Sequence, residues 1–281
     1  MNNRGLAPFV HDLSARYSVM PDPVLAPLAA SFGRVAEAYD RGRPPYPPAA
    51  LGWLTSGLGL TGESTVLDLA AGTGKLTAGL RPLVGRVIAV EPAAEMRRLL
   101  EAAQPQVDVR VGTAEAIPLA AGDVDAVLVA AAFHWFKPEA ALAEIHRVLR
   151  PRGGLGLLWN RPEWDAERWY PEFAAVLDRA RAAQDSPPNL YSVGPWRAAL
   201  DNSPLFGPVR KREFRHVHRV SRDEFLARVA SWSVVAVLPG DRRSEILNEV
   251  GEMLDGRGLG TLDLRYRTDT YRTVAHQSVS S

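Results

Sequence analysis

Residues 64–80 constrain the fold of this chain more than any other segment. Residues 64–69 form an apolar run typical of a buried strand, with Asp68 near its end. Small residues follow, including Gly72 and Gly74, and the segment then takes on the composition of a helix. A strand that passes through a small-residue loop into a helix brings backbone N–H groups close to a bound nucleotide. An ordinary tight connection between strand and helix would use the same residues.

The spacing of the small residues excludes two common nucleotide-binding loops. A dinucleotide fingerprint, G-x-G-x-x-G/A, would need a third small residue where Thr77 stands. A P-loop, G-x-x-x-x-G-K-[ST], matches at Gly74 and Lys75 but meets Leu69 and Leu76 at its two other defining positions. The loop therefore favours neither a dinucleotide nor a triphosphate.

The remaining pattern is D-x-A-x-G-x-G, which begins at Asp68 and has Ala70 in the place of a third glycine. A β-branched run at 86–90 follows and ends at Glu91 and Pro92. A carboxylate at the end of such a strand can accept hydrogen bonds from both hydroxyls of a ribose. The alternative for Glu91 is a solvated carboxylate that the dipole of the next helix favours.

Further strand-like segments continue the alternation with helices. Residues 107–111 alternate as a strand and lead into the turn at 112–118, and residues 124–130 read as a buried strand. The latter runs into Ala-Ala-Phe-His-Trp-Phe at 131–136, and a Pro-Arg-Gly-Gly turn precedes the next strand, 155–159.

In this order, the segments resemble the class I S-adenosylmethionine-dependent methyltransferases over residues 32–160, and the lead-in at 32–47 resembles the trans-aconitate methyltransferase-like group. The resemblance implies an α/β fold with a Rossmann-like, seven-stranded, mostly parallel sheet, an antiparallel C-terminal hairpin and a helical lid insertion. It also implies four parts: an N-terminal extension at 1–30, a cofactor-binding core at 31–160, a lid at 161–205, and C-terminal strands and helices at 206–281 that complete the sheet.

The resemblance further implies S-adenosyl-L-methionine as the cofactor. Its candidate contacts lie in the lead-in, in the loop and at the strand ends: Tyr39, Arg43, Tyr46, Asp68, Ala70, Gly72, Gly74, Glu91, Pro92, Met96, Thr113, Ala114, Glu115, Ala131 and His134. Thr113 stands where the family often has an aspartate that binds the adenine amino group, so Thr113 or the backbone at Ala114 would hold the adenine. The alternatives are that Tyr39 packs its helix and that Glu115 is a surface turn residue.

Methyl transfer from a sulfonium needs mainly alignment of the reacting atoms and exclusion of water. A base is needed only where the acceptor must lose a proton, and His134 is the candidate because it follows the fourth strand at the carboxyl edge. Its alternative role is to pack against or cap the cofactor. We therefore predict a methyltransferase that acts on oxygen, carbon or nitrogen of a small molecule. The alternatives are a non-catalytic cofactor-binding sensor or scaffold, and a nicotinamide-dependent oxidoreductase, which the loop spacing disfavours.

Composition limits which other classes of ligand and partner we expect. The net charge is +1 and no basic stripe occurs, so we expect no nucleic acid. The chain has no cysteine, which removes thiolate metal sites and iron–sulfur clusters. His216 and His218 share one face of a predicted strand but lack a third ligand, so we expect no metal. No apolar run reaches ~18 residues and no signal-peptide core is evident, so we expect no membrane partner and a cytoplasmic location. The acceptor and the oligomeric state stay open.

Overall fold

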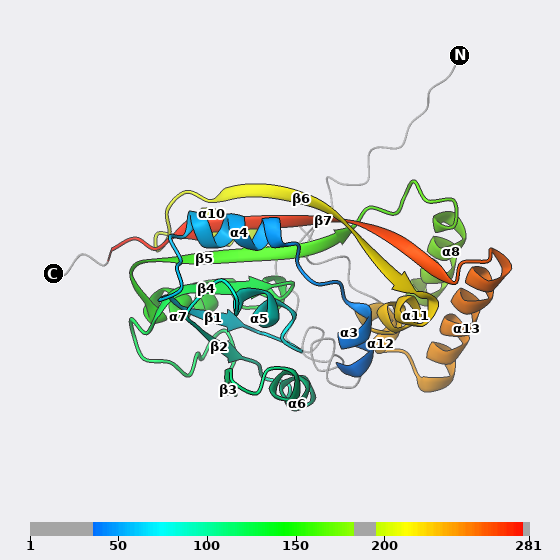
Figure 1. The fold of residues 1–281 in the computed structure, drawn as a ribbon, viewed down its shortest axis with the longest axis horizontal. Coiled ribbons are helices and arrows are strands. Elements are labelled where there is room, and N and C mark those ends of the chain that lie inside the picture. Colours follow the sequence, from blue (N-terminus) through cyan, green and yellow to red (C-terminus); the bar gives the residue numbers. More distant parts are fainter. Residues whose placement is uncertain (1–35, 183–194, 278–281) are drawn as a thin grey trace, which may run out of the picture.

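The computed structural model describes residues 36–182 and 195–277, so the predicted N-terminal extension lies outside the described residues. One seven-stranded sheet runs through the molecule, with helices on both faces and a separate group of helices beyond one end (Figure 1). The first five strands along the chain are β1 (Thr65–Leu69), β2 (Arg86–Val90), β3 (Asp108–Arg110), β4 (Val124–Ala130) and β5 (Leu149–Pro162).

The strand order is β3-β2-β1-β4-β5-β7-β6, and the first five strands are parallel. β7 (Thr261–Val274) lies between β5 and β6 (Arg210–Ser221) and is antiparallel to both. The predicted seven-stranded, mostly parallel sheet with antiparallel C-terminal strands is therefore confirmed. β6 and β7 pair as the expected hairpin, but helices rather than a tight turn connect them.

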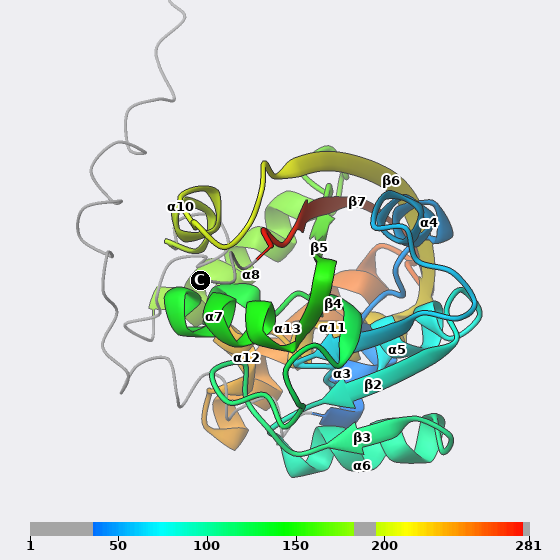
Figure 2. The same ribbon diagram turned by 90° about the vertical axis from the view of Figure 1, so that its left-hand side faces the viewer.

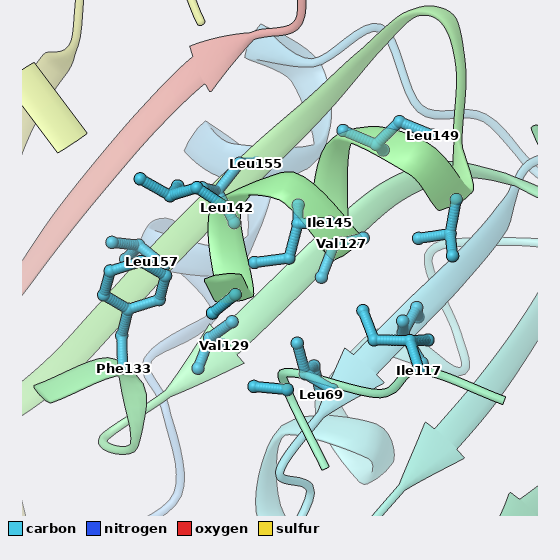
Figure 3. Packing of buried hydrophobic residues seen from close by; sticks show 14 of the residues in the cluster. Leu69, Ile117, Val127, Val129, Phe133, Leu142, Ile145, Leu149, Leu155 and Leu157 are labelled. Atoms are coloured by element: carbon cyan, nitrogen blue, oxygen red, sulfur yellow. The ribbon is translucent and has the colours of Figure 1, made fainter. Parts of the chain in front are cut away.

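Two apolar layers cover the parallel strands, and this explains why those strands are apolar on both faces. On one face, α7 (Pro138–Val148) and α10 (Trp196–Asp201) pack on Leu67, Val127 and Leu155. Figure 3 shows Leu142 and Ile145 of α7 lying against side chains of β4 and β5. In Figure 2, α7 and α10 lie to the left of these strands.

The opposite face of the sheet is covered by α4 (Pro48–Gly57) and α5 (Lys75–Leu80), which pack on Val66 and Leu128. Pro48 begins α4, where its missing N–H is not needed. α6 (Ala94–Ala103) follows β2, and the buried Leu100 of this helix contacts the loop after β1.

A third apolar cluster lies beyond one end of the parallel strands. It joins α8 (Tyr170–Ala182) to α11 (Arg222–Ala230), α12 (Ser233–Ala236) and α13 (Gly240–Gly256), and to the ends of β6 and β7 (Figure 1). This helical unit, which we call the helical cap, combines residues of the predicted lid with residues that follow it in sequence. A capping box begins α11, because Ser221 Oγ accepts from the Glu224 N–H and the Glu224 carboxylate accepts from the Ser221 N–H.

The first described helix, α3 (Ala36–Gly42), lies between the loop after β1 and the helical cap (Figure 1). It packs closely on α11, because a Cβ atom added to Gly42 would lie 2.2 Å from the backbone nitrogen of Arg228. Within residues 36–182 and 195–277, no helix combines the length and apolar character that a membrane crossing requires.

Candidate functional site

The site is built where β1 and β4 lie side by side and their connections leave to opposite sides. Ligands of open α/β sheets bind at the carboxyl ends of the strands at such a point. Ala70 follows β1 with a φ of 57°, and Ala131 follows β4 with a φ of 54°. This left-handed conformation costs a residue with a Cβ atom roughly 1–2 kcal/mol. Two strained alanines at adjacent strand ends are typical of a functional site.

The two glycines of the loop are required for different reasons. Gly72 has a φ of 58°, and a Cβ atom at this position would lie 4.0 Å from Cε1 of Tyr39. Gly74 has a φ of 86°, and its Cβ atom would lie 3.0 Å from Cγ of Leu100 on α6. Gly72 therefore allows the loop to turn, and Gly74 also allows α6 to approach it.

Glu91 joins the end of β2 to this loop. One carboxylate oxygen accepts a hydrogen bond from the Gly72 N–H at 2.9 Å, and the other accepts from the Ala93 N–H at 2.9 Å. Its exposure is 7%, and burial raises the pKa of this carboxyl above its usual range. The alternative in which Glu91 is a solvated carboxylate is therefore wrong. Each oxygen keeps a lone pair for a further donor.

Asp68 lies deeper, at the end of β1, with 0% of its surface exposed. Oδ2 accepts a 2.6 Å hydrogen bond from the Thr77 hydroxyl, whereas Oδ1 has no hydrogen-bond partner among the described residues. Burial raises the pKa of Asp68 to about 7. The Thr73 hydroxyl of the same loop is also buried without a partner in the described ranges. The loop thus presents an acceptor that a cationic or N–H-bearing ligand would satisfy.

The predicted adenine contacts lie next to the carboxyl end of β3. Thr113 is exposed and forms an isolated bridge with Ala116, and Ala114 is buried. Glu115 accepts a hydrogen bond from the N–H of Lys137, the residue that precedes α7. Glu115 therefore also anchors the start of a helix, which goes beyond a surface turn residue. Two further predicted contacts, Pro92 and Met96, lie just after β2, the former exposed and the latter buried.

His134 lies in the short 3-10 helix η1 (Phe133–Trp135) directly after β4. Its Nδ1 atom accepts a hydrogen bond from the indole N–H of Trp159 at 3.1 Å. Burial, aided by the positive charges of Arg161 and Arg43, lowers the pKa of His134 to about 3. The imidazole is therefore neutral at physiological pH and carries its proton on Nε2. With Nδ1 engaged, this side chain offers the site an N–H donor, which favours its packing role over that of a base.

The predicted lead-in residues connect the loop to the helical cap. Asp40 forms a 2.8 Å ion pair with Lys75, at the start of α5. Arg43 donates to the hydroxyl and the carbonyl of Ser231, each at 3.2 Å, and its guanidinium lies 4.9 Å from the ring centre of Tyr39. α3 and the residue after it are thus tied at one side to the loop and at the other to α11.

Two functional candidates escaped the sequence analysis. Asn160, near the end of β5, donates to the carbonyls of Pro44 and Pro45 at 3.3 and 3.1 Å and so holds the lead-in over the sheet. Arg228 is a buried cation on α11. The sequence did contain a signal for Arg228. It lies three residues after Phe225 and one before Val229, and since both are fully buried, the helical period places Arg228 on the buried face of α11.

The remaining predicted contact, Tyr46, lies among Tyr39, Asp68, Arg43 and Arg228, and burial raises the pKa of its hydroxyl. His216 and His218 share one face of β6, as predicted. No group of three metal-ligating side chains occurs in the part of the chain that the structure describes.

Comparison with known proteins gives the site its context. A family model described as a methyltransferase domain matches residues 67–157. An uncharacterised methyltransferase of Mycobacterium tuberculosis is 37% identical over 227 residues, which cover 81% of this chain and 86% of that relative. A solved structure from Anaeromyxobacter dehalogenans, described as a candidate type II methyltransferase, is 27% identical with a TM-score of 0.57 and covers 84% of this chain and 97% of its own.

A more distant solved structure shares the fold alone. It is a phosphoethanolamine N-methyltransferase of Haemonchus contortus in complex with S-adenosylhomocysteine, 11% identical with a TM-score of 0.50, and the match covers 89% of this chain and 60% of its own. The relatives, the sheet order and the loop between β1 and α5 lead to one conclusion. The chain belongs to the class I S-adenosylmethionine-dependent methyltransferases.

Proposed function

We propose that this methyltransferase binds S-adenosylmethionine in the loop after β1 and transfers its methyl group to oxygen, carbon or nitrogen of a small-molecule acceptor. The observation that supports the proposal most is the hydrogen bond between Gly72 and Glu91. It brings the glycine loop and a strand-end carboxylate together at the edge of the sheet where nucleotides bind. The Haemonchus contortus protein, which has this fold, was solved with the demethylated product bound.

The buried polar atoms of the site fit the groups of this cofactor. The unpartnered Oδ1 of Asp68 suits the cationic ammonium of the methionine moiety. The free lone pairs of Glu91 suit the two ribose hydroxyls. Thr113 and the Ala114 backbone, at the end of β3, suit the adenine. The strained loop positions allow the backbone to approach all three groups.

The cofactor, when bound, supplies a methyl group that is already activated as part of a sulfonium. The residues of this chain therefore have to bind, orient and exclude water rather than activate a leaving group. Tyr39, Arg43 and Tyr46 lie between the loop and the helical cap and cover this side of the site. His134 presents Nε2–H, so we assign it an orienting role rather than that of a general base.

Calorimetry with S-adenosylhomocysteine tests the cofactor assignment. We expect the wild-type protein to bind it and Glu91→Ala to bind it at least about tenfold more weakly. The substitution removes two hydrogen bonds to the ribose together with the acceptor of the Gly72 N–H. Glu101→Ala is the matched control, since Glu101 is exposed on α6 and its loss should leave the affinity unchanged.

Unchanged affinity in Glu91→Ala would refute the ribose role, and no binding by the wild-type protein would refute the cofactor. Competition by NAD at the same site would instead support an oxidoreductase. A methyl-transfer screen against carboxylic acids, phenols and amines separates an enzyme from a non-catalytic sensor. Binding without turnover on any of these acceptors would favour the sensor.

A further inference from the structure

The buried polar atoms that lack a hydrogen-bond partner among the described residues fall into two groups. Two of them, on Asp68 and Thr73, lie at the end of β1 and in the loop that follows it, where we place the cofactor. The other six atoms come from five side chains that lie where α11 of the helical cap meets β6, β7 and the residues after β5: Trp164, His216, His218, Arg228 and Tyr266. Buried polar groups without partners are rare in folded proteins, so a second group of this kind requires an explanation.

Arg228 is the centre of this second group. It is 2% exposed, and its Nε and Nη1 atoms have no acceptor in the described ranges. Three aromatic rings surround the guanidinium, at 4.9 Å for Tyr266, 5.5 Å for Trp164 and 5.8 Å for Trp232. These rings stabilise a cation only in part. Burial lowers its pKa to about 10, so the guanidinium stays charged at neutral pH.

Two of the other four unpartnered atoms in the group are also available as donors. The Trp164 indole nitrogen can only donate, and the buried Tyr266 hydroxyl can donate. His216, whose ring stacks on Tyr266 at 5.6 Å, and His218 bring one further ring nitrogen each. Burial is the main cause that lowers the pKa of Arg228, and no carboxylate of the described residues pairs with its guanidinium. The group therefore matches a ligand that carries acceptors and a negative charge.

The position of this group places it next to the cofactor loop. Gly42 allows α3 to contact the backbone of Arg228 directly. The lead-in then continues through Arg43, which donates hydrogen bonds to Ser231, one turn after Arg228. It reaches Tyr46, whose hydroxyl pKa responds to the charges of both Asp68 and Arg228. The guanidinium thus faces the same lead-in residues as the loop does, but from the side of the helical cap.

From these contacts we propose that Arg228, assisted by Tyr266, binds a carboxylate group of the methyl acceptor. The proposal rests on the proposed function, because it assigns the acceptor end of the same site. A single buried guanidinium balances a single negative charge, and the aromatic rings around it suit the carbon skeleton of an organic acid. Arg228 is then an acceptor-binding residue, and its buried charge lacks a counter-ion because the bound anion supplies one.

Binding of organic acids to the full chain, saturated with S-adenosylhomocysteine, tests this assignment. The probes are succinate, glutarate, benzoate and phenylacetate, each compared with its neutral amide, together with inorganic phosphate. We expect at least one acid to bind about tenfold or more tightly than its amide. Arg228→Met should lose this preference, Arg228→Lys should keep part of it, and Tyr266→Phe should weaken acid binding several-fold.

Two controls separate recognition from folding. Arg222→Met removes a half-buried arginine of the same helix, which pairs with Asp255, and should leave acid binding unchanged. Arg228→Met should melt at the same temperature as the wild type or higher, because it removes a buried charge without an acceptor among the described residues. A purely structural arginine would lower the melting temperature. Should Arg228→Met not fold, Arg228→Lys and Tyr266→Phe decide by the same affinities.

Each outcome is decisive. Acid binding that survives in Arg228→Met, a preference for phosphate, or no binding of any acid while S-adenosylhomocysteine still binds would overturn the proposal and leave the proposed function intact. Failure of the wild-type protein to bind S-adenosylhomocysteine would instead overturn the proposed function. In that case the acid panel, repeated without it, still judges Arg228 on its own.

Discussion

At the scale of single residues, Asp68 carries the clearest electrostatic signature of the site. Burial raises its pKa from 3.8 to about 7, so the ligand-free protein favours the protonated carboxyl. A raised pKa contributes stability that is complete below pH 3.8 and is lost as the pH rises through about 7. The free energy of unfolding of the wild type, relative to Asp68→Asn, should therefore fall between pH 4 and pH 7 and then level off.

Urea unfolding at several pH values, without cofactor, measures this difference. Asparagine keeps an oxygen for the Thr77 hydroxyl, so the variant isolates the titration. A difference that rises with pH would contradict the burial argument. If the ionised carboxylate holds the cofactor ammonium, the affinity for S-adenosylhomocysteine should change the other way, weakening below pH 7 in the wild type alone.

The sequence placed Glu91 and His134 at the ends of strands but left the role of each residue open. Glu91 followed from its place at the end of an apolar strand, and burial confirms that it is no solvated carboxylate. The chemistry of His134 depends on Trp159, which lies 25 residues later and donates to it across two neighbouring strands. A pattern in one segment does not contain that partner, so the choice between base and packing residue was open.

At the scale of elements, α3 is the connection on which the site depends. A Cβ atom at Gly42 would overlap the backbone of Arg228 on α11, where no flexible side chain can give way. Gly42→Ala should therefore push α3 away and lower the free energy of unfolding by roughly 1–3 kcal/mol, as overpacking does. It should also weaken S-adenosylhomocysteine binding, because α3 carries Tyr39 and Asp40 to the loop.

Gly52→Ala on α4 is the matched control for this substitution. Nothing lies within 4 Å of a Cβ atom added to Gly52, and alanine is the better helix former. We expect it to raise the free energy of unfolding by about 0.5–1 kcal/mol. Equal effects of the two alanines, measured by urea unfolding, would show that α3 does not pack on α11 as described.

Most element boundaries followed from local patterns. The helix at 75–80 begins where the small residues of the loop end, as the sequence predicts. The pairing of β6 with β7 was expected from the family resemblance alone, since α11, α12 and α13 separate two strands that pair along their length. Long-range pairing is decided by which apolar faces remain to be covered, and a turn signal does not contain this information.

At the scale of the whole molecule, the sheet and the helical cap have separate apolar clusters. α3 bridges them through the Asp40–Lys75 ion pair at the loop and the Arg43–Ser231 hydrogen bonds at the cap. A ligand that orders the loop should therefore also order the cap. We expect S-adenosylhomocysteine to slow amide hydrogen exchange in α3 and α11 by several-fold or more, and to leave α10, on the opposite face of the sheet, unchanged.

The same exchange measurement on Asp40→Asn provides the control. Removing the ion pair to Lys75 should reduce the protection of α11 while the loop itself is still protected. Equal protection of α11 in both proteins would mean that the cap is coupled to the loop by another route.

The sequence by itself determined the fold class, the loop after β1 and the acid at the end of β2, because strand periodicity and loop spacing are properties of short segments. It also predicted the absence of cysteine chemistry, which follows from composition. Only the tertiary structure decided the neutral form of His134 and the group around Arg228. Trp164, Arg228 and Tyr266 lie far apart in the sequence and meet only because α11 packs against α3, the pair β6–β7 and the rest of the helical cap. Burial, which turns an ordinary arginine into a recognition group, is a property of that packing.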